Sequence, residues 1–119
     1  MWWGVAVETP DPHALAGFYS GLLDWPVVHR EADTAVVAAP DGPIFLVFQA
    51  AAGYEPPVWP PVAGRQRPMM HLDFQVADLE SAVGEAVALG ATLAEAQPNE
   101  TVRVLLDPAG HPFCLSAND

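Results

Sequence analysis

The chain has 119 residues, of which 51% are hydrophobic and 16% charged, a composition typical of one folded domain rather than a disordered segment. Fifteen Asp and Glu against four Arg give a formal net charge of −11, which argues against a nucleic-acid partner. The chain has no lysine, and this absence excludes Schiff-base chemistry. No apolar run approaches the ~18 residues of a membrane span, and the opening residues do not resemble a signal peptide, so we expect a cytoplasmic protein with no membrane partner.

The first half of the sequence predicts one strand, one helix and three further strands. Residues 2–9 alternate in polarity with period two, as a strand does. Asp11 followed by Pro12 is typical of a helix start, and apolar residues at helical spacing extend the predicted helix over 12–23. Three further strands are expected. The first begins with residues 25–29, the second spans 35–39, and the third spans 44–49 after a Pro-Asp-Gly-Pro turn.

The second half repeats this order after residues 53–68, a proline-rich stretch without periodicity that predicts a linker loop. A strand over 71–76 is followed by Asp78 as the cap of a helix over 79–89, which Gly90 ends. The apolar residues expected to face inward from this helix are Ala82, Val83, Ala86 and Val87. Three strands follow, near 92–93 and over 101–106 and 112–116. Gly4 and His71, Glu8 and Gln75, and Asp11 and Asp78 correspond at a constant offset of 67, which indicates an internal repeat.

Three segments carry a resemblance to a known superfamily: DPHALAGFYSGLLDW, HLDFQVADLESAVGEAVALGAT and LLDPAGHPFCLS. The chain resembles the vicinal-oxygen-chelate superfamily, which includes glyoxalase I, bleomycin-resistance proteins and extradiol dioxygenases, and is most similar to its small bacterial glyoxalase-like proteins. The resemblance implies an α+β fold in which two βαβββ half-modules form one curved eight-stranded sheet, a cup with the helices on its outer face. We therefore expect a single domain over 1–119, with half-modules at about 1–52 and 69–119.

The resemblance also implies where metal-dependent members hold their ion, at one position on the first and one on the last strand of each half. These positions are Gly4, His71, Cys114 and one residue of the strand 44–49, which is Leu46 or Phe48 in one alignment and Val47 or Gln49 in the other. Only His71 keeps a usual ligand type, so we expect no metal and no cofactor. A displaced site of His71, Glu8 and Cys114 stays open as an alternative.

Several polar and aromatic residues are candidates for the inside of the cup. The expected ligand-binding residues are Glu8, Gln49, Tyr54, Trp59, His71, Asp73, Gln75 and Cys114, and His71 is also the candidate catalytic residue. Asp73 can orient the His71 imidazole, but we expect a water or a ligand to bridge the two, because residues two apart on a strand point in parallel. Cys114 is interpreted as a small thiol without nucleophilic activation.

Two further histidines and two tryptophans are assigned to structure. We expect Trp3 and Trp25 to lie in the core between sheet and helix, and His13 and His111 to be structural or surface residues. Trp2 shares the face of Gly4 and Glu8 and is placed at the rim of the cup.

Three functions remain open at this point. The first is metal-free binding of a small, planar or cationic organic ligand by a homodimer, through aromatic stacking and cation–π contact. The second is a lyase, isomerase or dioxygenase-type enzyme that uses His71 with a displaced metal or as a general base. The third is an interaction module whose cup is filled by its own side chains.

Overall fold

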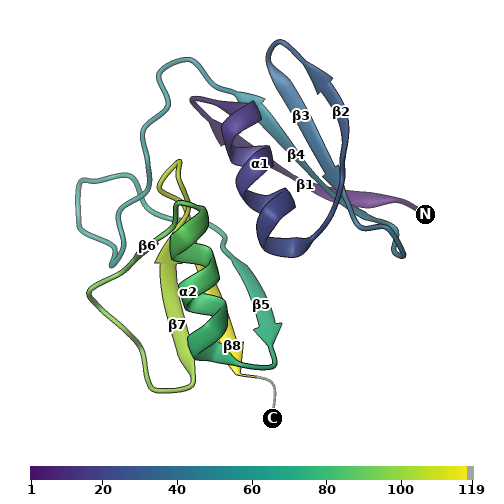
Figure 1. The fold of residues 1–119 in the computed structure, drawn as a ribbon. Coiled ribbons are helices and arrows are strands. Elements are labelled where there is room, and N and C mark those ends of the chain that lie inside the picture. The colour runs from purple at the N-terminus through teal and green to yellow at the C-terminus, as the bar shows by residue number, and fades with distance from the viewer. Residues whose placement is uncertain (118–119) are drawn as a thin grey trace. The chain divides into compact units, whose positions relative to one another are not determined.

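The computed structural model describes residues 1–117 and divides into two compact units, one of residues 1–54 and one that begins at residue 55. Each unit contains one strand, one helix and three strands in chain order (Figure 1). The α+β class and the two βαβββ half-modules are therefore confirmed. None of the helices among the described residues is long and apolar enough to cross a membrane.

The first unit has a four-stranded mixed sheet and one helix. Its elements are β1 (Trp3–Thr9), α1 (Pro12–Leu23), β2 (Val27–Glu31), β3 (Thr34–Ala38) and β4 (Ile44–Ala50). The strand order is β1-β4-β3-β2, with β1 parallel to β4 and the other neighbours antiparallel. The helix begins where predicted, because the Asp11 carboxylate accepts the backbone N–H of Ala14 at 3.1 Å and Pro12 occupies the first turn.

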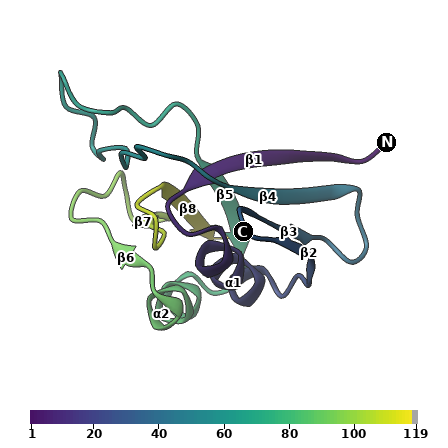
Figure 2. The same ribbon diagram turned by 90° about the horizontal axis from the view of Figure 1, so that it is seen from above.

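Figure 2 shows α1 lying along one face of this sheet, and the core of the first unit lies between the two. Leu15, Phe18 and Tyr19 of the helix are almost fully buried, as are Leu46 and Phe48 of β4. The Tyr19 and Phe48 rings stack with centroids 5.5 Å apart. Apolar residues at helical spacing on α1 and at every second position of β4 thus meet at one interface.

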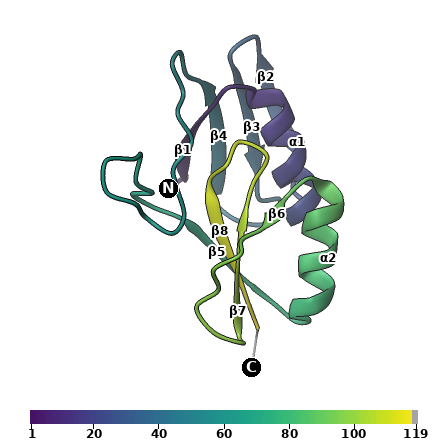
Figure 3. The same cartoon turned by 90° about the vertical axis from the view of Figure 1, so that its left-hand side faces the viewer.

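The second unit repeats the arrangement. It contains β5 (Leu72–Val76), α2 (Leu79–Leu89), β6 (Thr92–Leu93), β7 (Val102–Leu106) and β8 (Pro112–Ala117), in the strand order β5-β8-β7-β6. Figure 3 shows α2 running along one side of these strands. Asp78 caps the helix by accepting the N–H of Ser81 at 3.0 Å, and Gly90 ends it with a φ of 121°.

The pairing of first and last strands follows the same register in both units. Ala6 pairs with Val47 and Glu8 with Gln49, while Asp73 pairs with Cys114 and Gln75 with Ser116. These pairs are related by the offset of 67 found in the sequence, so the internal repeat extends to the closing strands. The register also decides the alignment of the strand 44–49. Leu46 and Phe48 are buried beneath α1, and Val47 and Gln49 point to the other face with Gly4 and Glu8.

The two sheets are separate in their hydrogen bonding, since no ladder joins the first four strands to the last four among the described residues. The continuous eight-stranded sheet, the cup that needs both halves, and the single domain therefore stay predictions from the resemblance. The loop between β4 and β5 has neither helix nor strand, as expected for a proline-rich linker.

For two residues the prediction that they lie in the core is wrong. Trp3 is 51% exposed, because it is the first residue of β1 and β1 is an edge strand of its sheet. Val87, predicted to face inward from α2, is 47% exposed, because Ala86 rather than Val87 makes the buried contact and the next residue turns 100° away from it. Trp25 is half-buried and precedes β2, which starts at Val27 rather than at Trp25.

The alternation in β5 generates a stability prediction. Phe74 is half-buried and its ring lies 6.2 Å from that of buried Phe113, whereas Gln75 is exposed. We expect Phe74→Ala to lower the free energy of unfolding by about 3 kcal/mol, at the low end of the usual range for buried phenylalanine. Gln75→Ala should change it by less than about 0.5 kcal/mol, as an exposed substitution does. Urea unfolding followed by circular dichroism measures both, and the reverse ranking would show that the face assignment is wrong.

Candidate functional site

A polar stripe occupies the exposed face of β5. His71, Asp73 and Gln75 are exposed, and Leu72, Phe74 and Val76 between them are half-buried. On the neighbouring strand, Phe113 and Leu115 are fully buried while Cys114 between them is only partly covered. Strand alternation thus sends the apolar residues of β5 and β8 to the core and brings His71, Asp73 and Cys114 to the opposite face.

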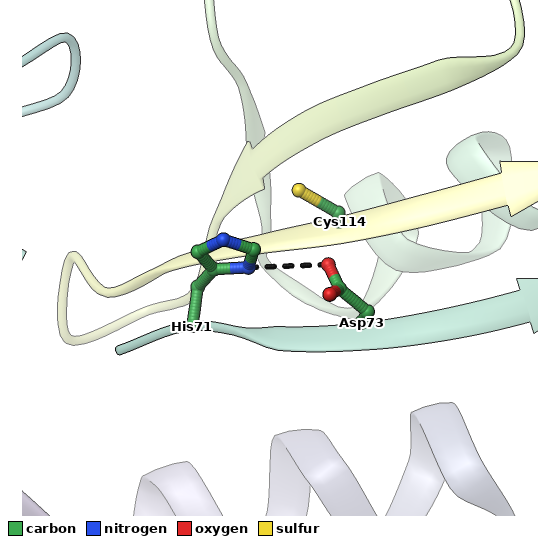
Figure 4. A group of neighbouring side chains, drawn as sticks. All are labelled: His71, Asp73 and Cys114. Carbon is green, nitrogen blue, oxygen red and sulfur yellow. Dashed lines mark ion pairs between the residues drawn. The ribbon is translucent and has the colours of Figure 1, made fainter. Parts of the chain in front are cut away.

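His71 and Asp73 contact each other directly. His71 Nδ1 lies 3.1 Å from Asp73 Oδ1, with side chains 47% and 64% exposed (Figure 4). The expectation that a water or ligand must bridge them is wrong. His71 precedes the first residue of β5, so its side chain is not held parallel to that of Asp73 and can lean toward it. An ionised Asp73 accepts the Nδ1–H, which leaves Nε2 of a neutral imidazole as a free acceptor.

Cys114 reaches the same carboxylate from β8, where it pairs with Asp73 in the parallel ladder. Burial, hydrogen bonding with Asp73 and the negative charge of Asp73, in this order, raise the pKa of Cys114 to about 11. The thiol therefore stays protonated at neutral pH, which supports its interpretation as a residue that is not an activated nucleophile.

One nitrogen, one carboxylate oxygen and the sulfur of these three side chains lie within 4.8 Å of one another. We name His71, Asp73 and Cys114 the second-half cluster. The sequence placed all three among the candidate residues but combined His71 and Cys114 with Glu8 instead of Asp73. The signal that identifies Asp73 is the period-two alternation over 71–76, which places it on the same face as His71.

The first half does not offer the corresponding ligands. Val47 is apolar, and at Gly4 a Cβ atom would lie 2.6 Å from the backbone oxygen of Phe45 and would collide with the Phe45 ring. A side chain of any kind at position 4 thus requires β4 to move. The four-position metal set that the resemblance implies is therefore not supplied by this chain, and a hard ion such as Mn²⁺ or Mg²⁺ finds too few His or carboxylate ligands.

The other candidate residues belong to different parts of the chain. Glu8 and Gln49 are exposed neighbours on β1 and β4 of the first unit, and Tyr54 is half-buried at its end. Trp59 is half-buried in the loop of the second unit, and its indole Nε1 is buried without a hydrogen-bond partner in the described part of the chain. The ligand contacts expected of these residues stay predictions.

The remaining histidines have structural surroundings, as expected. His111 lies 3.0 Å from the buried Asp107 carboxylate, which also accepts two backbone N–H groups of the turn before β8. His13 is exposed on the first turn of α1. His29 Nε2 lies 3.2 Å from Glu31 on β2, with both side chains more than half exposed, and so repeats the His71–Asp73 contact without a thiol.

The glyoxalase-like domain model matches residues 4–116, nearly the whole chain. The chain belongs to this glyoxalase-like family. No curated protein sequence matches it significantly. Among solved structures, it is similar to a glyoxalase/bleomycin resistance protein/dioxygenase family enzyme from Burkholderia phytofirmans, with 22% identity, a TM-score of 0.73 and coverage of 96% of this chain and 95% of that one.

Two further solved structures have a similar likeness to this chain. The fosfomycin resistance protein FosX from Mesorhizobium loti is 15% identical with a TM-score of 0.70, over all of this chain and 92% of that one. A glyoxalase/bleomycin resistance protein from Albidiferax ferrireducens is 19% identical with a TM-score of 0.65, over all of this chain and 99% of that one. At these identities the likeness shows the shared fold of the family and not a shared ligand.

The raised pKa of Cys114 generates a reactivity prediction. Because the folded-state pKa lies above the ordinary value of 9.0, the thiol stays protonated as pH rises through 9 and becomes a thiolate only near 11. Labelling by iodoacetamide in the native protein should follow this higher midpoint. Asp73→Asn should move the midpoint down, because it removes the negative charge while the burial stays. The rate of labelling against pH, followed by mass spectrometry, measures both, and a native midpoint at 9 would contradict the assignment.

Proposed function

We propose that this glyoxalase-like protein binds a small organic ligand, planar or cationic, and needs no metal ion to do so. The observation that carries the proposal is the exposed Asp73 carboxylate, which lies beside His71 and Cys114 on the open face of β5 and β8. An exposed carboxylate beside these two side chains can accept a hydrogen bond from a cationic group of a ligand. His71 Nε2 supplies a second acceptor beside it.

The charge of the chain supports a cationic rather than an anionic ligand. The net charge is −11, there is no lysine, and the second-half cluster contains no positive group unless His71 is protonated. By contrast, the FosX protein from Listeria monocytogenes was crystallised with Mn(II) and 1S,2S-dihydroxypropylphosphonic acid, a ligand that is an anion at neutral pH. The net negative charge of this chain would repel an anionic phosphonate. Gly4 and Val47 also provide no ligands for Mn(II). The proposal therefore does not extend the fosfomycin chemistry of that neighbour to this chain.

A second candidate function is an enzyme in which His71 is a general base. The 3.1 Å contact between His71 Nδ1 and Asp73 favours it, because it fixes the ring and leaves Nε2 free to take a proton from a substrate. The reaction classes compatible with proton abstraction are those of lyases and isomerases. Turnover that is lost in His71→Ala, while ligand binding persists, would distinguish this candidate from binding alone.

The proposed binding function predicts a specific effect of charge at Asp73. We expect Asp73→Asn to weaken the binding of a planar aromatic cation such as acridine orange by about 10- to 100-fold, the usual contribution of a hydrogen bond to a charged group. Glu31→Gln is the matched control, because it removes one negative charge from the equivalent His29–Glu31 pair on β2. Titration calorimetry measures both variants, with and without EDTA.

The Glu31→Gln control distinguishes a direct contact of the ligand with Asp73 from attraction by the net negative charge of the chain. Equal loss in both variants would mean that only the net charge attracts the dye, and no binding by the native protein to a panel of planar or cationic compounds would contradict the proposal. Loss of binding in EDTA would show that the ligand requires a metal.

We also propose that the protein is a cytoplasmic homodimer. Trp2, Trp3, Met69 and Met70 are between 51% and 86% exposed, and large exposed apolar side chains favour association. We expect light scattering of the purified protein at micromolar concentration to give about twice the 12.7 kDa mass of the chain. Trp3→Glu should shift the mass toward the monomer, and a native mass of one chain would rule out the dimer.

A further inference from the structure

We propose that His71, Asp73 and Cys114 form a binding site for Zn²⁺ or a similar borderline transition-metal ion. The site lies entirely within the second unit and differs in composition from the four-position set that the resemblance implies, since it uses Asp73 and no residue of the first half. The inference goes beyond the proposed function and does not depend on it, because it concerns the ion alone.

The geometry of the three side chains supports a single ion. Their ligand atoms lie within 4.8 Å of one another, and His71 Nδ1 and Asp73 Oδ1 are 3.1 Å apart. A tetrahedral zinc ion with bonds of about 2.0–2.3 Å separates its ligand atoms by about 3.3–3.6 Å. The cluster thus needs only small side-chain rotations to close around an ion, and the exposed His71 and Asp73 side chains are free to make them (Figure 4).

The parallel ladder fixes the part of the site that cannot rotate. Asp73 and Cys114 pair directly between β5 and β8, and Phe113 and Leu115 on either side of Cys114 are buried in the core. The backbone positions of the oxygen and sulfur ligands are therefore held by the sheet. Among residues 1–117, this is the group of His, Cys, Asp and Glu side chains that meets the spacing required for a metal ion.

The chemistry of the donors selects the ion. Imidazole nitrogen, carboxylate oxygen and sulfur together suit Zn²⁺ and Co²⁺, whereas Mg²⁺ and Ca²⁺ prefer oxygen alone. Binding breaks the Cys114 S–H bond, releases its proton to the buffer and forms a sulfur–zinc bond, with no change in oxidation state. The carboxylate and thiolate then balance the two positive charges of the ion. Three protein ligands leave a fourth coordination position that the cluster does not fill.

The first unit contains a natural comparison. His29 and Glu31 have the same spacing in sequence as His71 and Asp73, nearly the same separation of 3.2 Å and similar exposure, but no cysteine completes the group. If a His–carboxylate pair at this spacing were sufficient, both pairs would bind the ion. The third ligand from β8 is what distinguishes the second-half cluster.

The test uses the full-length protein after removal of metals with a chelator. We expect one Zn²⁺ per chain by titration calorimetry, and Co²⁺ should produce a thiolate-to-metal charge-transfer band in the near ultraviolet. Cys114→Ser should abolish this band, and Asp73→Asn and His71→Ala should each weaken zinc binding by at least about tenfold, since even groups that only support a ligand contribute ten- to 100-fold. His29→Ala should leave binding unchanged.

The outcomes decide the assignment without reference to an organic ligand. No zinc binding, a cobalt complex without the charge-transfer band, or binding that falls equally in His29→Ala and His71→Ala would each overturn the site. Circular dichroism of the variants excludes unfolding as the cause of lost binding, and Asp73→Asn, which keeps the shape of the side chain, provides a second measurement if Cys114→Ser is unstable.

Discussion

In-register parallel pairing between the first and last strands of each half-module determines both the core and the candidate site. In the second unit this register places Phe74 opposite Leu115 and Asp73 opposite Cys114. Because neighbouring strand residues point to opposite faces, one register puts the apolar pair into the core and the polar pair on the open side. A shift by one residue would bury the Asp73 carboxylate and expose Phe74, at a cost on both faces. The stability of the fold therefore fixes the position of the chemically active groups.

The two half-modules keep the same register but differ in what they present on it. Ala6 and Val47 occupy the places of Asp73 and Cys114, and Gly4, which corresponds to His71, leaves no room for a side chain beside Phe45. The fold is thus repeated, while the potential ligands are confined to one half. The repeat therefore explains the architecture of both halves, whereas only the second-half cluster bears on function.

The fold could be predicted from the sequence almost element by element, because its signals are local. Both helices start at an Asp cap and have the predicted limits, and the alternation in β5 assigned the correct faces to His71 and Phe74. The errors occur at positions where neighbouring strands rather than sequence periodicity determine the burial of a residue, as for Trp3 on an edge strand. The contact between His71 and Asp73 was missed for a similar reason, since ideal strand geometry does not hold at the residue before a strand begins.

Asp73 connects the two uses proposed for the cluster. Its carboxylate contacts His71 and lies beside the Cys114 thiol, and both of these groups carry a proton that an incoming cation can replace or share. An organic cation leaves the Cys114 proton in place and uses the outer lone pairs of the carboxylate, whereas zinc displaces that proton and takes the sulfur as well. The two occupants therefore compete for Asp73 but respond differently to Cys114, because only the ion needs the thiolate. A serine at position 114, which keeps a hydrogen-bond donor for Asp73 but offers no sulfur, should separate them: it removes the ion and retains the organic ligand.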